Sequence, residues 1–352
     1  MRKIKVAVIG CGMIAQTQHI QHYHDNDKAE IKYLVDPMLK RAEEMAEKFG
    51  VPHAVADYRT VLEDEEVEAV SICTPNDTHA PIAIACLNAG KHVICEKPAA
   101  LNIEQVREMK AAADRNNRIL NIGLVNRYNT AVNHIKRMIA DGELGRVYHV
   151  YCSFRAHRSI PGLGGPFTTK AKAGGGVLID WGVHFLDLIF YSLGQTELKT
   201  VSGAIHGELA KDMKNYTYVD MWAGPPRYEG TYDVEDFVTG MLRTSGPTIS
   251  LNGAWAQNIG EKAMFIEFLG DKAGIKLEYG GGFKIYSSKA GSLLETTPSF
   301  SSSNMFYDEI DDFLESAASN VKKRVNIDDV IITSEAIDAI YRSAAEGKEI
   351  QL

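Results

Sequence analysis

The chain has 352 residues, which is more than a single hydrophobic core usually organises, so we expect two domains. Hydrophobic residues make up 45% of it and charged residues 24%, as in an ordinary globular protein. A formal net charge of −8 argues against a nucleic-acid partner, because such binding needs clustered basic side chains. The longest basic cluster is only Lys322-Lys323-Arg324.

Membrane proteins and disulfide- or metal-stabilised proteins are disfavoured on similar grounds. We find no apolar run that approaches the roughly 20 residues of a membrane span. The N-terminal residues through Ile9 are typical of a first strand and not of a secretory signal, so we expect a cytoplasmic protein that binds no membrane. The five cysteines are odd in number and lack zinc spacing, so neither disulfides nor a bound metal are expected.

The first 125 residues alternate short β-branched runs with helical patterns, which predicts parallel strands joined by right-handed crossovers. The predicted strands are Lys3–Ile9, Ile31–Val35, Val67–Thr74, His92–Cys95 and Ile119–Ile122. One helix is predicted over Pro37–Phe49, ending at Gly50, and another over Ala80–Asn88, capped by Asp77 or Thr78.

Beyond Asn126 the pattern changes to consecutive strand-like runs, which predicts an α+β domain with a large, mostly antiparallel open sheet. The predicted strands are Val147–Phe154, Val234–Arg243, Thr248–Trp255, Ala263–Gly270, Gly274–Glu278 and Phe283–Ser287. Helices are predicted over Ala131–Asp141, Phe306–Ser316 and Ile327–Ala345. The chain is thus α/β in class, with domains at 1–125 and 126–352, and the C-terminal helices can pack back on the first domain.

Between these strands, residues 207–232 follow neither helical nor strand periodicity and are rich in aromatic side chains. An irregular stretch of this length inside a compact domain is often a functional loop or a subunit contact, and plain packing is an equally good interpretation. We call residues 207–232 the insert.

A glycine-rich turn follows the first predicted strand, in the pattern Gly10-x-Gly12-x-x-Ala15. The first glycine permits a tight turn, the second lets a pyrophosphate approach the backbone, and a small third residue lets helix and strand pack closely. The helix that opens at Met13 and Ile14 offers free N–H groups to the phosphates. This context predicts a dinucleotide site.

Asp36 ends the second predicted strand, where a carboxylate accepts hydrogen bonds from the ribose hydroxyls of NAD. The same charge would repel the 2′-phosphate of NADP, so NAD is favoured. Two alternatives stay open: Arg41 could accept a 2′-phosphate after a local rearrangement, and Asp36 could serve only as a helix cap before Pro37.

The run from Thr74 through Pro75 and Asn76 to His79 starts at the carboxyl end of a predicted parallel strand, the edge where open α/β sheets bind ligands. These residues are candidates for cofactor contacts. A purely structural turn and cap is the alternative.

Three ionisable residues form the candidate catalytic set: Lys97, Asp180 and His184. Oxidising a secondary alcohol requires a base that takes the hydroxyl proton, and histidine titrates near neutrality. Asp180 lies four residues before His184 on an apolar helix, so it can orient the imidazole, with Asp187 as a competitor. Lys97 can donate a hydrogen bond to the substrate oxygen and, with its pKa lowered by a cationic nicotinamide, can share the acid–base role. Taken singly, each residue is better explained by a structural role, but the three together, in this order behind a dinucleotide fingerprint, favour catalysis.

The chain resembles the Gfo/Idh/MocA oxidoreductase family, the group of glucose-fructose oxidoreductase and inositol dehydrogenase, over nearly its whole length. The matching features are the Gly10/Gly12/Ala15 turn, Thr74-Pro75-Asn76, Glu96-Lys97-Pro98, Gly174-Gly175-Gly176 and the Asp180/His184 pair. The resemblance implies a Rossmann domain, a second domain whose sheet builds homodimers or homotetramers, a cofactor contact at Glu96, catalytic roles for Lys97, Asp180 and His184, and a cis Lys97–Pro98 peptide.

The resemblance also places four residues where the family lines its sugar pocket: Arg127, Tyr128, Arg155 and His157. The leading hypothesis is an NAD-dependent dehydrogenase acting on a ring hydroxyl of a sugar, glycoside or cyclitol. Two alternatives stay open: an enzyme that recycles NAD during glycosidase or epimerase chemistry through transient oxidation at C3, and a sugar-sensing regulator without catalysis. The insert leaves the substrate and its reacting hydroxyl open.

Overall fold

A computed structural model describes residues 2–194 and 196–352, and the chain divides into two compact units. The first unit contains the residues up to Tyr128 together with Ser303–Ile331, and the second contains Asn129–Ser302 together with Ile332–Leu352. The second unit is therefore not one continuous stretch from residue 126, because the segment around the first C-terminal helix returns to the first unit.

The first unit alternates strands and helices from its start. Its strands are β1 (Ile4–Ile9), β2 (Ala29–Val35), β3 (His53–Val55), β4 (Ala69–Ile72), β5 (His92–Glu96) and β6 (Leu120–Gly123). Its helices are α1 (Gln21–His24), α2 (Leu39–Phe49), α3 (Arg59–Glu63), α4 (Asn76–Asn88), α5 (Ile103–Arg115) and α9 (Met305–Ser319), with a π-helical segment at Ala15–Ile20 and a short 3-10 turn at Val125–Tyr128.

The six strands form one parallel sheet in the order β3-β2-β1-β4-β5-β6. This is the strand order of the dinucleotide-binding Rossmann fold. Strands β2 and β3 extend the sheet on one side of β1, and β4, β5 and β6 extend it on the other side. Strand β4 is buried throughout and β1 nearly so, as expected of a parallel sheet covered on both faces. The predicted fold of the N-terminal region is confirmed.

One prediction in this unit was wrong in detail. Helix α4 begins at Asn76 and not at Ala80, and no side chain caps it, because Pro75 stands at the N-cap position. The Thr78 hydroxyl donates instead to the Pro75 carbonyl at 2.7 Å. The missing N–H of Pro81 therefore falls inside the helix and not in its first turn.

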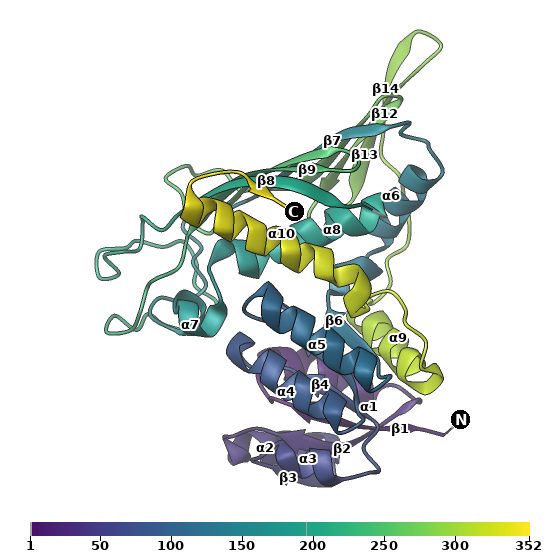
Figure 1. The fold of residues 1–352 in the computed structure, drawn as a ribbon, viewed down its shortest axis with the longest axis vertical. Helices are drawn as coiled ribbons and strands as arrows, with labels where there is room; N and C mark the ends of the chain where they lie inside the picture. The colour runs from purple at the N-terminus through teal and green to yellow at the C-terminus, as the bar shows by residue number, and fades with distance from the viewer. Residues whose placement is uncertain (1, 195) are drawn as a thin grey trace. The chain divides into compact units, whose positions relative to one another are not determined.

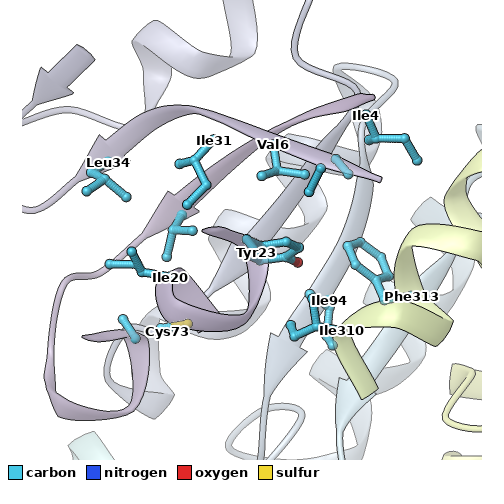
Figure 2. Close-up of a cluster of buried hydrophobic side chains, with 14 of the residues drawn as sticks. Ile4, Val6, Ile20, Tyr23, Ile31, Leu34, Cys73, Ile94, Ile310 and Phe313 are labelled. Carbon is cyan, nitrogen blue, oxygen red and sulfur yellow. The ribbon is translucent and has the colours of Figure 1, made fainter. Parts of the chain in front are cut away.

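The core of the first unit joins segments from both ends of the chain. Figure 2 shows Val6 of β1, Tyr23 of α1 and Ile94 of β5 packed against Ile310 and Phe313 of α9. Helix α9 thus supplies part of the apolar cover of this sheet, although about 180 residues separate it from β6 in sequence.

The second unit is dominated by strands. They are β7 (Val147–Arg155), β8 (Leu198–His206), β9 (Phe237–Thr244), β10 (Thr248–Ala254), β11 (Ala263–Gly270), β12 (Ala273–Glu278), β13 (Phe283–Lys289), β14 (Ser292–Thr296) and β15 (Ile350–Gln351). The helical segments are α6 (Thr130–Ala140), a 3-10 turn (Pro166–Thr168), α7 (Lys170–Ala173), a π-helical segment (Leu178–Gly182), α8 (Val183–Leu193) and α10, which spans Ile327–Glu346 and so begins in the first unit.

These strands form a second sheet in the order β14-β13-β12-β11-β7-β10-β9-β8-β15, antiparallel except for the β7–β10 pair. Helices α6, α8 and the second-unit part of α10 lie along one face of it, and the opposite face carries no helix (Figure 1). The predicted open, mostly antiparallel sheet is confirmed. Strands β8 and β14 were not predicted, since β8 alternates weakly and β14 is exposed along its whole length.

The expectation about apolar runs needs correction. The stretch 170–193, which includes α8, is long and apolar enough to cross a membrane by length and composition alone. Its most apolar window is 83% buried, as is typical of the core helix of a globular domain. Burial inside the second unit accounts for its composition.

The placement of α9 predicts an energetic dependence of the first unit on Phe313. Phe313→Ala should lower the free energy of unfolding by about 3–5 kcal/mol, because the ring is fully buried and leaves a cavity. Chemical denaturation would measure it. Leu293→Ala, at a site that is 92% exposed, is the matched control and should change stability by less than about 0.5 kcal/mol. Equal effects of the two variants would contradict the role of α9.

Candidate active site

The glycine-rich turn joins β1 to the following helix at the carboxyl end of the first sheet. Gly10 has a φ of +92°, and a Cβ there would lie 2.5 Å from the Cys73 carbonyl oxygen, so only glycine fits. A Cβ at Gly12 would meet nothing within 4 Å. The backbone at Gly12 is therefore open to a ligand, and the turn fits the pyrophosphate of a dinucleotide.

Asp36 ties this turn to the end of β2. Its Oδ2 accepts the Cys11 N–H at 3.0 Å and a guanidinium N–H of Arg41 at 3.1 Å, and its Oδ1 accepts the Met38 N–H at 2.8 Å. The carboxylate is buried. Burial and the charge of Asp36 raise the pKa of the Cys11 thiol to about 12, so this thiol stays protonated.

His79 joins two turns that follow neighbouring strands. Its Nδ1 lies 2.8 Å from the Pro98 carbonyl oxygen and its Nε2 lies 2.8 Å from the Thr74 carbonyl oxygen. The side chain is buried and both ring nitrogens face backbone oxygens. His79 therefore links the turn at Thr74 to the turn that carries Lys97, and its expected contact with the cofactor stays a prediction.

Glu96, the last residue of β5, belongs to a buried polar chain. Its Oε1 lies 2.9 Å from His19 Nε2, His19 Nδ1 lies 3.0 Å from the Ser71 hydroxyl, and that hydroxyl lies 2.8 Å from Tyr23 OH. Burial by itself raises the pKa of Glu96, but the hydrogen bond and charge of His19, with the charge of Lys97, bring it below its usual value. Glu96 is therefore held as a carboxylate directly before Lys97.

Lys97 follows β5 at the carboxyl edge of the first sheet, the same edge as the glycine turn and Thr74. Its side chain is half-buried, and its backbone N–H donates to Glu96 Oε2 at 3.2 Å. The Lys97–Pro98 peptide is cis, as the resemblance implies. Within the first unit the predicted cofactor and lysine positions thus gather on one sheet edge.

Asp180 and His184 stand on one helix of the second unit. Asp180 lies in the π-helical segment Leu178–Gly182, which continues into α8, and α8 carries His184. Four residues make about one turn of either helix type, so the two side chains leave the helix on the same side. Asp180 is buried and His184 half-buried. Short π-helical segments occur often at functional sites.

A glutamate that the sequence analysis did not identify holds the start of this helix. Glu235 Oε2 accepts the Gly176 N–H at 2.9 Å, and its Oε1 accepts the Leu178 N–H at 3.0 Å and the Tyr341 hydroxyl at 2.8 Å. Three converging donors and the helix dipole favour the carboxylate form. Burial acts against it and raises the pKa of Glu235. This contact fixes the helix that presents Asp180 and His184.

The glycines before this helix allow that close approach. A Cβ at Gly176 would lie 1.9 Å from the Glu235 carbonyl oxygen, and a Cβ at Gly175 would lie 2.0 Å from the Tyr341 hydroxyl. Any side chain at either position would therefore displace Glu235 or α10. The glycine run in the motif is thus explained by backbone packing.

The ring of Tyr279 lies near His184. The ring of His184 lies 6.4 Å from the ring of Tyr279, centroid to centroid, and Tyr279 stacks on Phe185 at 4.5 Å. Asp187, the competing orienter, has its Oδ1 3.4 Å from the Thr333 hydroxyl of α10. Asp187 therefore connects α8 to α10, whereas Asp180 shares the face of His184.

The four expected substrate contacts differ in their surroundings. Arg127 is buried and donates to the carbonyls of Arg324 at 2.8 Å and Asp329 at 3.2 Å. Tyr128 is also buried and donates to Asp312 Oδ2 at 2.7 Å. Both contact the C-terminal segment within the first unit, and their expected role at the sugar stays a prediction. Arg155 is half-buried at the end of β7 and donates to the Ser153 hydroxyl, and His157 follows it.

Comparison with known protein families identifies both halves of the chain. A model described as an oxidoreductase family with an NAD-binding Rossmann fold matches residues 4–124, and the GFO/IDH/MocA C-terminal domain matches residues 132–276. The chain belongs to the GFO/IDH/MocA oxidoreductase family. The resemblance drawn from the sequence motifs is thereby confirmed, as is the NAD-binding fold of the first unit.

Individual members of the family are similar over most or all of the chain. The D-glucoside 3-dehydrogenase of Escherichia coli (strain K12) is 29% identical over 99% of this chain and 97% of its own. The scyllo-inositol 2-dehydrogenase (NAD(+)) of Bacillus subtilis (strain 168) is 30% identical over 62% of each. The structure of a levoglucosan dehydrogenase with NADH and L-sorbose, at 24% identity, has a TM-score of 0.85 over 100% of this chain and 99% of that one, so the fold is shared.

Metal-ligating side chains do not cluster in the part of the chain that the structure describes: no group of three or more His, Cys, Asp or Glu among 2–194 and 196–352 could hold a metal ion. All five cysteines are buried free thiols.

The functional residue that sequence reasoning missed is Glu235. Its only sequence signal is an acidic pair, Glu235-Asp236, at the start of an otherwise apolar predicted strand, and the structure shows that the strand begins later, at Phe237.

The contacts of Glu235 predict a specific loss in Glu235→Gln. An amide has one acceptor oxygen and an NH₂ group that opposes a second N–H, so at least one buried donor loses its partner, at a cost of about 1–3 kcal/mol. We expect that loss in chemical denaturation together with a lower kcat. Glu229→Gln is the matched control, because Glu229 is exposed and its pairing with Lys214 at 3.1 Å is worth little. Wild-type stability and kcat in Glu235→Gln would contradict the assignment.

Proposed function

We propose that the protein is an NAD-dependent dehydrogenase that oxidises a secondary ring hydroxyl of a sugar, glycoside or cyclitol. The observation that carries the proposal is the helix held by Glu235, which presents Asp180 and His184 on one side in a chain of this family. The family relatives named above act on D-glucosides and scyllo-inositol, by their names, which supports this class of substrate.

The residues divide the reaction between them as follows. Bound NAD would supply the hydride acceptor, at the edge formed by the glycine turn and Asp36. His184 takes the proton from the substrate hydroxyl while the carbon that bears this hydroxyl gives its hydride to the cofactor. Asp180 orients the imidazole of His184 and stabilises the positive charge that forms on it. The Lys97 ammonium donates a hydrogen bond to the oxygen as it becomes a carbonyl. The convergence of Lys97 with Asp180 and His184 around one substrate is part of the proposal.

We propose NAD and not NADP as the working cofactor. Asp36 is a buried carboxylate beside the glycine turn, and its charge would oppose a 2′-phosphate. Arg41 supports the same preference, since its guanidinium is paired with Asp36 at 3.1 Å.

We further propose that the protein acts in the cytoplasm as a homodimer or homotetramer formed through the second sheet. The face of that sheet without helices carries half-buried Tyr151 and Phe265 and exposed Tyr286 and Met241. Aromatic residues and methionine on such a face are typical of protein interfaces.

The lysine assignment predicts the effect of Lys97→Ala. Turnover should fall by about two to four orders of magnitude, because a positioned donor to the substrate oxygen is lost. NAD affinity, measured by protein fluorescence, should stay within about threefold. Lys40→Ala, on the exposed surface of α2, is the control and should keep the wild-type rate. NADH formation would be followed by absorbance with a panel of sugars, glycosides and inositols. An unchanged rate in Lys97→Ala would reject the assigned role.

The cofactor assignment predicts the effect of Asp36→Asn. Removing the charge should raise KM for NAD about tenfold and narrow the preference for NAD over NADP by a similar factor, since Arg41 then loses its ion partner. The amide side chain of this variant would still offer one acceptor oxygen, so the thermal midpoint checks that folding is preserved. A cofactor preference equal to that of the wild type would contradict the role of Asp36.

A further inference from the structure

A hollow of about 310 Å³ opens within the second unit. It lies between the end of β7, the π-helical segment that precedes α8 and the insert. Its polar and aromatic lining includes His157, Trp181, Asp220, Trp222 and Lys262. We call it the aromatic hollow. It lies at the small end of the roughly 300–1,000 Å³ that small-molecule pockets span, which suits one ring.

Two of the three tryptophans of the chain line the aromatic hollow. Trp222 is 53% exposed, which is unusual for so large an apolar ring, and Phe167 braces it edge-to-face at 5.0 Å. Trp181 is the residue directly after Asp180. The third, Trp255, is fully buried in the core. The two rings that line the hollow are therefore surfaces on which the apolar face of a pyranose can stack.

The wall that carries Trp222 is built in advance of any ligand. Three backbone hydrogen bonds join the insert to the loop that follows β7. They run from Val219 N to Arg158 O at 2.9 Å, from Ala223 N to Pro161 O at 2.7 Å and from Arg227 N to Leu163 O at 2.9 Å. The two ends of the insert are fastened to one buried carboxylate, Asp236. That carboxylate accepts the Leu209 N–H at 3.0 Å and the Tyr232 hydroxyl at 3.1 Å. A fixed aromatic surface binds with a small loss of conformational entropy.

Charged and polar groups alternate with these rings. Asp220 can accept hydrogen bonds from sugar hydroxyls, Lys262 can donate them, and His157 can do either. Neither Asp180 nor His184 lines the aromatic hollow, and Trp181, which does, is the residue directly after Asp180 in the π-helical segment. A ring bound here would be distinct from a ring held at Asp180 and His184.

We propose that the aromatic hollow binds the second ring of a two-ring glycoside, so that the preferred substrate is a disaccharide or similar glycoside whose other ring is oxidised. This inference rests on the proposed function, because it assigns a subsite to the same reaction. The insert then contributes to substrate specificity. Neither the first unit nor the helix that carries Asp180 and His184 depends on it for its fold.

The test compares one-ring and two-ring substrates. Methyl β-D-glucopyranoside is the one-ring probe, and cellobiose, maltose and sucrose are the two-ring probes, with NADH formation as the readout. In the wild type we expect at least one disaccharide to show a tenfold or greater advantage in kcat/KM. Trp222→Ala should abolish that advantage by raising KM for the disaccharide about tenfold while the one-ring parameters stay unchanged. Trp222→Phe should restore most of it.

The matched control is Tyr228→Ala, an exposed aromatic residue of the same insert that does not line the aromatic hollow, and it should behave as the wild type. No disaccharide advantage in the wild type, or equal losses on both substrate classes in Trp222→Ala, would overturn the proposal. Ligand-observed NMR of the same probes reads binding without turnover. Disaccharide binding that depends on Trp222 in a protein that forms no NADH would uphold the subsite and reject the proposed dehydrogenase activity.

Discussion

The buried carboxylate of Glu235 at the start of the helix that carries Asp180 and His184 is the contact on which the second unit depends. It satisfies two backbone N–H groups that no helix can satisfy internally and receives the Tyr341 hydroxyl from α10. Desolvating a carboxylate is costly, and the raised pKa of Glu235 reflects that cost. Charge-assisted hydrogen bonds and the helix dipole offset it and fix the helix in place.

Buried polar side chains also order the turns at the carboxyl edge of the first sheet. Asp36 is buried where it accepts the Cys11 N–H of the glycine turn, and His79 joins the Thr74 carbonyl to the Pro98 carbonyl. Each polar side chain bridges turns that follow neighbouring parallel strands. Turns have little apolar surface of their own, so buried polar groups of this kind supply the order that a reaction site needs.

In the proposed reaction, the acid–base residues and the candidate subsite belong to different parts of the second unit. Glu235 accepts hydrogen bonds from the start of the helix that carries Asp180 and His184. Asp236, the next residue in the chain, accepts hydrogen bonds from the insert. Two adjacent carboxylates therefore organise the reactive helix and the wall of the aromatic hollow. In the proposed function, changes in the insert alter which ring binds in the aromatic hollow and leave Asp180 and His184 in place.

The sequence by itself determined the features that local chemistry specifies. The glycine spacing from Gly10 to Gly12, the apolar parallel strands and the period of the helices depend on neighbouring residues, so they could be predicted. The family and the placement of Asp180 and His184 on one helix could be predicted as well. Element ends were less predictable: α4 begins at Asn76 because Pro75 and Thr78 organise its first turn together.

Only the tertiary structure decided the contacts between residues far apart in the chain. The partner of Gly176 is Glu235, 59 residues away, and Arg127 donates to the carbonyl of Arg324, 197 residues away. Helix α9 completes the core of a unit formed mainly by the N-terminal residues. No local period encodes such pairs, because a buried polar group finds its partner through the packing of whole elements, whose free energies are set by the complete fold.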